Sequence, residues 1–252
     1  MRLRVVGSSS AVPRAGSACS CYLIEGGQAR VILDCGSGAV QSLRRFVDPL
    51  TLDAVLISHF HPDHVFDLVP LRYLRAFGAA PGMLDVYVHP GGGEGLRRLA
   101  LASASVDGER FFERSMRIAQ YDPAAALQLK GLHVTFAPAR HYIPAYAMRI
   151  DSGAASIAYS ADTAPVQSVI DLARGVDLFV CECSLGADGS DREPRGHSNA
   201  REAGAMARDA GVKQLLLTHY AGGVDVAELV SAARTAFDGP IAVAEDGLQI
   251  EV

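Results

Sequence analysis

The chain has 252 residues, of which 49% are hydrophobic and 20% are charged, and its formal net charge is −5. A chain of this length and apolar content can bury a sizeable core, so we predict a single domain over residues 1–252 and exclude extensive disorder. The negative charge argues against a large nucleic-acid surface, because binding to phosphates normally requires a basic patch.

Short apolar or β-branched runs alternate with segments of helical period, which predicts a mixed α/β (α+β) chain whose sheets are covered by helices. Strands are expected at about 2–6, 20–25, 30–34, 54–58, 84–88, 132–137, 146–150, 155–160, 177–182, 213–218, 240–244 and 248–252. Helices are expected near 38–47, 63–77, 93–104, 165–174, 199–210 and 225–236. Segment 105–130 is the least regular and is interpreted as a lid or a connection.

The location expected from the sequence is the cytoplasm. "MRLRVVGSSSAV" has too short an apolar run for a signal peptide, and no segment has the apolar length of a membrane helix. Five cysteines then favour reduced thiols over disulfides. They form two Cys-x-Cys pairs and one single residue: Cys19 and Cys21, Cys181 and Cys183, and Cys35. Packing is the favoured role for the pairs, with half of a structural zinc site as the alternative.

Two glycine-rich stretches, "VVGSSSAVP" and "DCGSGAVQ", each follow a predicted strand. Neither contains a phosphate-binding G-x-x-x-x-G-K-[ST] sequence, and "GSGAVQ" lacks the third glycine of a dinucleotide-binding turn. We therefore interpret both stretches as tight turns after strands.

The strongest chemical signal is "LISHFHPDHVFDL", residues 56–68, in which His59, His61, Asp63 and His64 fall within six positions. Imidazole and carboxylate are good ligands for zinc and similar divalent ions, and alternate side chains can turn toward two centres. The preceding apolar run reads as a strand, and Pro62 predicts the first turn of a helix. The ligands are therefore expected at a strand-to-helix junction.

Three more metal-competent residues follow predicted strands elsewhere in the chain. His141 follows "LHVTFAPAR", Asp162 follows "SIAYSA", and His219 follows "VKQLLLT". If these strand ends share one edge, their side chains converge there, as sites at the carboxyl ends of strands commonly do. The pattern predicts a composite metal site.

With these residues in place, the chain resembles the metallo-β-lactamase-fold hydrolases, and within them the ribonuclease Z-like phosphodiesterases. The similarity runs from "VVGSSSAVPRAGSACSCYLI" through "SHFHPDH", "YSADT" and "CECS" to "GHSNAREAGAMARDAGVKQLLLTHY" and "DGLQIEV". The resemblance implies a four-layer αββα metallo-β-lactamase sandwich. It also implies a homodimer.

The resemblance further implies two divalent metal ions, most suitably Zn²⁺, with Mn²⁺ and Fe²⁺ as alternatives. By it, His59, His61 and His141 hold one ion, Asp63, His64 and His219 hold the other, and Asp162 bridges them. Asp34, at the end of "VILD", matches an aspartate that supports the ligand loop without binding metal, with a turn or cap residue as the alternative.

A phosphodiester fits this charge arrangement. Two ions bring +4, Asp63 and Asp162 return −2, and a bridging hydroxide as the attacking nucleophile returns −1, leaving about +1 for an anionic substrate. Asp63 is also a candidate acceptor of the nucleophile's proton. By the resemblance, His197 contacts the scissile phosphate or protonates the leaving oxygen. Glu182, in "CECS", is expected to orient His197, with a satisfied strand-end carboxylate as the alternative.

Two functions from this family compete. We favour a phosphodiesterase acting on a small phosphodiester such as a cyclic nucleotide over a tRNA 3′-processing endonuclease, which makes RNA the less favoured partner. Family members that grip tRNA commonly insert a long glycine-rich arm between the equivalents of His141 and Asp162, and here that interval is just long enough for two strands and a turn. A non-enzymatic binding module ranks lower, since every expected ligand position is filled. Other hydrolases of this fold also rank lower, and His61 argues against the di-iron redox branch, where a carboxylate typically takes that place.

Overall fold

Two mixed β-sheets face each other in the computed structural model, which describes residues 1–104 and 108–252. The first sheet has the strand order β14-β1-β2-β3-β4-β5-β6. Its pairings are antiparallel from β14 to β3 and parallel from β3 to β6. The strands are β1 (Arg2–Gly7), β2 (Cys21–Gly26), β3 (Ala29–Leu33), β4 (Ala54–Leu56), β5 (Leu84–Val88), β6 (Met116–Gln120) and β14 (Gln249–Glu251).

The second sheet repeats this arrangement with the order β7-β8-β9-β10-β11-β12-β13. Its pairings are antiparallel from β7 to β10 and parallel from β10 to β13. The strands are β7 (Leu127–Leu129), β8 (Leu132–Pro138), β9 (Tyr146–Ser152), β10 (Ala155–Tyr159), β11 (Leu178–Glu182), β12 (Gln214–Thr218) and β13 (Ile241–Val243).

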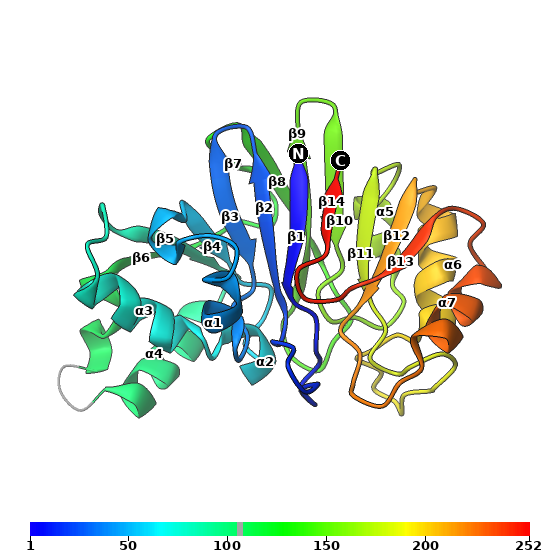
Figure 1. The fold of residues 1–252 in the computed structure, drawn as a ribbon, viewed down its shortest axis with the longest axis horizontal. Helices are drawn as coiled ribbons and strands as arrows, with labels where there is room; N and C mark the ends of the chain where they lie inside the picture. Colours follow the sequence, from blue (N-terminus) through cyan, green and yellow to red (C-terminus); the bar gives the residue numbers. More distant parts are fainter. Residues whose placement is uncertain (105–107) are drawn as a thin grey trace.

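Helices cover the outer face of each sheet, and the expected αββα order of layers is confirmed (Figure 1). The first sheet carries α1 (Ala39–Leu43), α2 (Pro62–Val65), α3 (Leu68–Phe77), α4 (Gly92–Ser103) and the 3₁₀ turns η1 (Pro49–Thr51), η2 (Gly108–Arg110) and η3 (Phe112–Arg114). The second sheet carries α5 (Gln167–Leu172), α6 (Ala200–Ala210) and α7 (Val226–Arg234). In the described part of the chain, no helix is both long and apolar enough to cross a bilayer.

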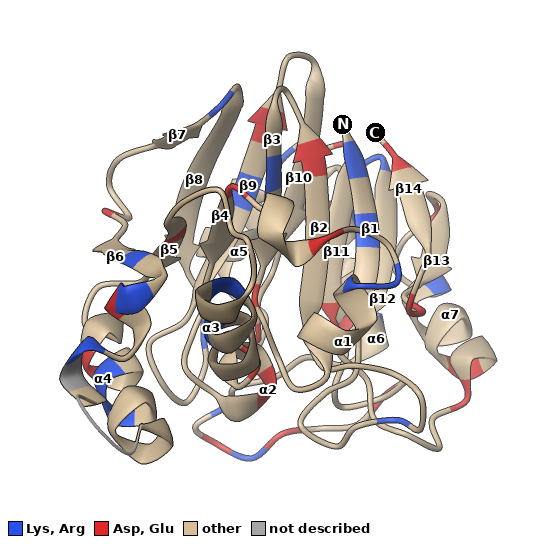
Figure 2. Cartoon of the chain, turned by 60° about the vertical axis from the view of Figure 1, so that its left-hand side comes forward, with Lys and Arg blue, Asp and Glu red and all other residues tan. Residues whose placement is uncertain are grey.

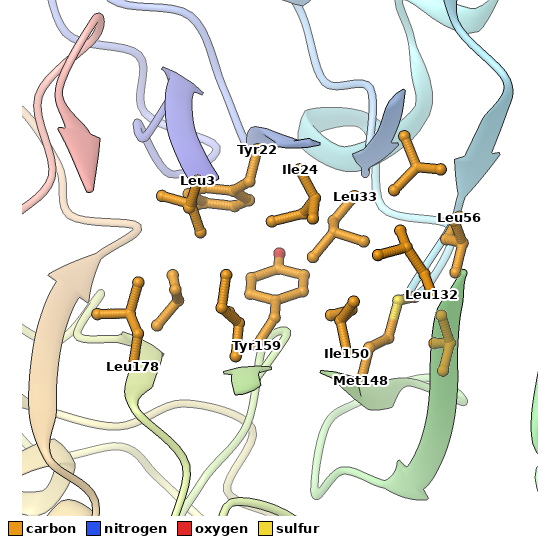
Figure 3. Close-up of a cluster of buried hydrophobic side chains, with 14 of the residues drawn as sticks. Leu3, Tyr22, Ile24, Leu33, Leu56, Leu132, Met148, Ile150, Tyr159 and Leu178 are labelled. Atoms are coloured by element: carbon orange, nitrogen blue, oxygen red, sulfur yellow. The ribbon is translucent and has the colours of Figure 1, made fainter. Parts of the chain in front are cut away.

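The core between the sheets explains why the strands read as nearly continuous apolar runs. In β3, Val31 and Leu33 face the space between the sheets, whereas Ile32 faces the helices, and all three are fully buried. Figure 3 shows the same inner layer with Tyr22 and Tyr159 meeting from opposite sheets. A strand buried on both faces loses the alternation of apolar and polar residues that marks an exposed sheet.

The five cysteines are free and buried, and they pack as small apolar groups. Cys21 and Cys35 lie in the layer under α1, and Cys181 and Cys183 lie in the layer under α6. No cysteine belongs to a metal-competent cluster within residues 1–104 and 108–252. The packing interpretation of the two Cys-x-Cys pairs is confirmed.

The expected helix over 63–77 is two helices, and this prediction was wrong. Helix α2 stops at Val65, because the Asp67 amide donates to the carbonyl of Cys35 at 3.0 Å in place of continuing the helical ladder. The Asp67 carboxylate then accepts from the Val40 amide at 2.8 Å, at the start of α1. This tie joins the metal-competent segment to the preceding turn.

The segment 105–130, expected to be irregular, contains β6 and β7. Both are strands at the edge of a sheet, and only Met116 among their residues is fully buried. Edge strands bury few side chains, so their sequences show no clear alternation of apolar and polar residues. The sequence pattern therefore did not predict these two strands. The part of this prediction that falls on residues 105–107 lies outside the described residues.

Candidate metal centre

The metal-competent loop between β4 and α2 is seated on the turn after β3. The Cys35 amide donates to the His64 carbonyl at 2.7 Å. A Cβ atom on Gly36 would lie only 1.9 Å from the carbonyl oxygen of Asp63, so no other residue permits this approach. The glycine-rich stretch "DCGSG" thus forms a tight turn, as expected, and it holds the ligand loop.

Asp34 supports this loop from a fully buried position after β3. Its carboxylate accepts from the amide and hydroxyl of Ser58, from Nδ1 of His64 and from the hydroxyl of Tyr159, each at 2.7 Å. Asp34 thus makes the contacts expected of a support for the loop. Sequence reasoning missed Ser58, which directly precedes the histidine motif. It also missed Tyr159, whose strand position carries no local signal.

One cluster brings together His59, His61, His141 and Asp162. Nε2 of His141 lies 2.9 Å from Nδ1 of His61, and Nε2 of His59 lies 3.6 Å from Oδ2 of Asp162. These side chains come from the loop after β4, from the segment after β8 and from the end of β10. The convergence of strand ends expected from the sequence is therefore present.

A second cluster brings together Asp63, His64, Asp162 and His219. Nε2 of His219 lies 3.0 Å from Oδ2 of Asp63, and Nε2 of His64 lies 3.2 Å from Oδ1 of Asp162. Asp162 thus belongs to both clusters and presents Oδ2 to the first and Oδ1 to the second. A carboxylate so placed can contact two centres at once.

The donor set fits divalent metal ions. The ligand atoms of each cluster lie within 4.8 Å of one another, a span that accommodates metal bonds of about 2.0–2.2 Å. Nε2 of His59 and Oδ1 of Asp162 are buried without a hydrogen-bond partner. Buried polar atoms normally have partners, so these atoms mark places where a further group fits.

The hydrogen bonds of the histidines set which ring nitrogen faces the clusters. Nδ1 of His64 donates to Asp34, and Nδ1 of His141 donates to the carbonyl of Gly196 at 2.8 Å, so Nε2 is the nitrogen that each ring turns toward its cluster. Burial lowers the pKa of His59 well below its usual value and also lowers the pKa of His61 and of His141. Neutral imidazole is the form that binds a metal ion.

Glu182 and His197 form a separate pair beside the second cluster. Nδ1 of His197 donates to Oε1 of Glu182 at 2.8 Å, while the other oxygen of Glu182 accepts from the amide and hydroxyl of Ser184, each at 2.9 Å. Burial by itself would lower the pKa of His197, but the hydrogen bond to Glu182 and its charge raise that pKa to about 9. This contact places Glu182 where it could orient His197.

The clusters open into a pocket of about 420 Å³. Asp63, Asp162, His197 and His219 line it, together with apolar side chains. Glu182 is fully buried and does not line the pocket, so it acts through His197. The seven metal-competent residues expected from the sequence are all brought together at the carboxyl edge of the two sheets.

Residues 29–220 match the family model described as the beta-lactamase superfamily domain. The chain belongs to the β-lactamase superfamily. It is 32% identical over 251 residues to a probable metallo-hydrolase, YhfI of Bacillus subtilis, covering 98% of each chain. The crystal structure of YhfI, a metallo-beta-lactamase fold protein, matches with a TM-score of 0.90 at 31% identity and covers 100% of this chain and 98% of that one.

The chain is also similar to ribonuclease Z proteins over its whole length. It is 28% identical over 276 residues to ribonuclease Z of Mycobacterium bovis, covering 100% of this chain and 98% of the relative. The crystal structure of human tRNase Z, short form, shares the fold with a TM-score of 0.77 at 18% identity, over 100% of this chain and 99% of that one.

Proposed function

We propose that the chain is a hydrolase that uses two divalent metal ions to cleave a small phosphodiester, with a cyclic nucleotide as the favoured substrate class. The observation that carries the proposal is the position of Asp162, which presents one carboxylate oxygen to each of two ligand clusters beside one pocket. Zinc is the proposed metal, because sets of imidazole and carboxylate ligands suit it well, with manganese and iron as alternatives.

One ion would be held by His59, His61 and His141, and the other by Asp63, His64 and His219. Asp162 would be shared between them. When bound, two such ions lower the pKa of water and offset the charge of a phosphodiester. Hydrolysis adds the oxygen of that water to phosphorus and breaks one P–O ester bond, so one proton leaves the water and one reaches the departing oxygen.

The protein's own residues supply the two proton-transfer groups. Asp63 lines the pocket, and although burial opposes this effect, the hydrogen bond from His219 and nearby histidine charge lower the pKa of Asp63. Its carboxylate is the proposed acceptor of the proton from the water. His197 also lines the pocket, with Nδ1 held by Glu182. We assign it to the phosphate and the departing oxygen.

The short interval before Asp162 and the charge distribution of the chain support a small substrate. Only the hairpin of β9 and β10 separates the ligand segment after β8 from Asp162, so no arm extends from this interval. Lysine and arginine lie interspersed with aspartate and glutamate along the chain (Figure 2). A tRNA substrate would need many phosphate contacts from a basic surface.

A ribonuclease Z-type tRNA 3′-processing endonuclease is the second candidate, and the 28% identity to ribonuclease Z of Mycobacterium bovis over the whole chain favours it. The interval between His141 and Asp162 and the net charge of −5 weigh against it. Both candidates use the same ligand clusters, so substrate choice alone separates them.

A competition among three substrates tests the proposal. Metal-loaded protein would be given a purine nucleoside 3′,5′-cyclic monophosphate, a short oligoribonucleotide and a precursor tRNA, and the kcat/KM of each would be measured. We expect the cyclic nucleotide to be cleaved with the highest kcat/KM, and activity to disappear on chelation. Preferred cleavage of the precursor tRNA at its 3′ end would favour the second candidate, and no hydrolysis of any phosphodiester would reject both.

The cytoplasm stays the proposed location, and the free state of the five cysteines supports it. A homodimer also stays a prediction, which the mass of the protein in solution can test.

A further inference from the structure

Tyr142 stands in the pocket wall directly after the ligand His141. Its ring centroid lies 5.0 Å from that of His141 and 5.5 Å from that of His197. The side chain is 49% exposed although it is aromatic, and it lines the pocket. Val12, which is 63% exposed, lines the same pocket. Large apolar side chains left open beside a polar centre indicate a place for an apolar part of a ligand.

The ring of Tyr142 is fixed by contacts to the segment that carries His197. Its hydroxyl donates to Oδ2 of Asp191 at 2.5 Å, and the same oxygen accepts from the amide of Gly196 at 2.7 Å. A Cβ atom on Gly196 would lie 2.6 Å from carbons of the Tyr142 ring, so a bare backbone lies against the ring. The ring is thus held in place before a ligand arrives, which reduces the entropy lost on binding.

Beyond the ligand clusters, His197 is the one cationic side chain among the described residues that line the pocket. None of the described residues that line it is lysine or arginine. Arg140, next to His141 in the chain, is paired with Glu193 at 3.0 Å, and Arg195 is paired with Glu202 at 2.7 Å. One phosphodiester charge would be met by the metal ions and His197, whereas a ligand with several phosphates would find no lysine or arginine for the others. The remaining contact surface is apolar and aromatic.

We propose that Tyr142 is the platform on which the nucleobase of the substrate stacks while its single phosphodiester lies at the metal centre. The inference rests on the proposed function and names the substrate class more closely, as a nucleoside phosphodiester with one negative charge. Every base has a planar face that can stack on an aromatic ring, so the platform selects for a base and tolerates different bases. Val12 adds apolar contact at the pocket wall.

The test compares adenosine 3′,5′-cyclic monophosphate with a base-free analogue, methyl ribofuranoside 3′,5′-cyclic phosphate. The measured quantity is the ratio of kcat/KM for the two compounds, in the unchanged protein, in Tyr142→Leu and in Tyr142→Phe. We expect the unchanged protein to prefer the nucleotide at least tenfold. In Tyr142→Leu, the ratio should fall at least tenfold because the KM for the nucleotide rises. Tyr142→Phe should retain most of the ratio. Phe77→Leu, at an exposed aromatic on α3, serves as the matched control.

A second measurement does not depend on turnover. Binding of adenosine to metal-free protein would be followed by titration calorimetry, and we expect weak binding that Tyr142→Leu abolishes and Phe77→Leu preserves. An unchanged kcat/KM ratio in Tyr142→Leu, or equal adenosine binding by both leucine variants, would overturn the platform while leaving the hydrolase proposal intact. Failure of the unchanged protein to cleave either cyclic phosphate would reject the proposed function, and adenosine binding would then decide the platform alone.

Discussion

The two halves of the molecule repeat one architecture, yet they contribute to the site in different ways. In each sheet three antiparallel pairings are followed by three parallel ones. The first half supplies its ligands from one loop, His59 to His64. The second half supplies single groups from separate segments: His141 after β8, Asp162 after β10, His197 before α6 and His219 after β12. A site between such halves depends on their packing as well as on either sequence.

Asp34 and Asp162 make this difference concrete. Each follows the strand at which antiparallel pairing changes to parallel pairing, β3 in the first sheet and β10 in the second. The backbone turns through the left-handed region at both places, with φ of 58° at Asp34 and 53° at Ala161. Asp34 is saturated with hydrogen-bond donors, whereas Oδ1 of Asp162 has none. A buried carboxylate shortly after this strand is thus a support in one half and a shared ligand candidate in the other.

The halves are linked directly by two tyrosines from the inner faces of the sheets. Tyr159 of the second half donates to Asp34 of the first half, and the hydroxyl of Tyr22 in the first half bonds to Thr218, which precedes His219, at 2.7 Å. The two rings lie 5.0 Å apart in the core (Figure 3). Each half therefore helps to hold a ligand segment of the other.

Replacing the shared residue should have the largest effect. We expect Asp162→Ala to lower activity by about 10³-fold or more, since metal ions contribute several kcal/mol to such reactions. Bound metal, measured by elemental analysis, should also fall. Asp171→Ala, at an exposed carboxylate on α5, is the matched control and should change neither quantity. Full metal occupancy in Asp162→Ala would contradict its assignment.

His197→Ala should separate chemistry from metal binding within the second half. We expect a fall in kcat of about 10²-fold, the lower range for losing a general acid, with metal content unchanged. Glu182→Gln should give a smaller fall, because the amide can still accept from Nδ1 of His197. Loss of metal from His197→Ala would show that the residue is a ligand.

Changing the support in the first half should weaken metal binding without abolishing it. In Asp34→Asn, the new amide NH₂ group would face hydrogen-bond donors that the carboxylate of Asp34 accepts from in the unchanged protein. We therefore expect metal affinity to fall about 10–100-fold. Competition with a chromophoric chelator measures it. Asp177→Asn is the control, since Asp177 likewise accepts from the amide and hydroxyl of one serine, Ser156, and belongs to neither cluster. An equal loss in both variants would refute the support role.

The smallest effect is expected from cutting one link between the halves. Tyr159→Phe removes a hydrogen bond to a buried carboxylate, and we expect the free energy of unfolding in chelator to fall by about 1.5–3 kcal/mol. Tyr22→Phe removes a bond between two hydroxyls and should cost about 0.5–1.5 kcal/mol. Denaturant unfolding of the two variants measures both losses. A larger loss of unfolding free energy in Tyr22→Phe would show that the bond from Tyr22 to Thr218 is the stronger of the two links.

The amino-acid sequence by itself determined the ligand loop and the succession of strands and helices. His59, His61, Asp63 and His64 fall within six positions after an apolar run, so local geometry alone brings them to one strand end. The strands of the inner core could be recognised because burial on both faces demands long apolar runs. The edge strands β6 and β7 and the break at Asp67 could not, because they depend on pairing and tertiary contact.

Only the tertiary structure decided how the two halves meet. That Asp162 presents one oxygen to each cluster, that Tyr159 reaches Asp34 across the core, and that the ring of Tyr142 lies open in the pocket all require contacts between residues distant in the chain. Such contacts follow from the packing of one sheet on the other, which buries the apolar layer between them. Residue spacing along the chain carries no record of that packing.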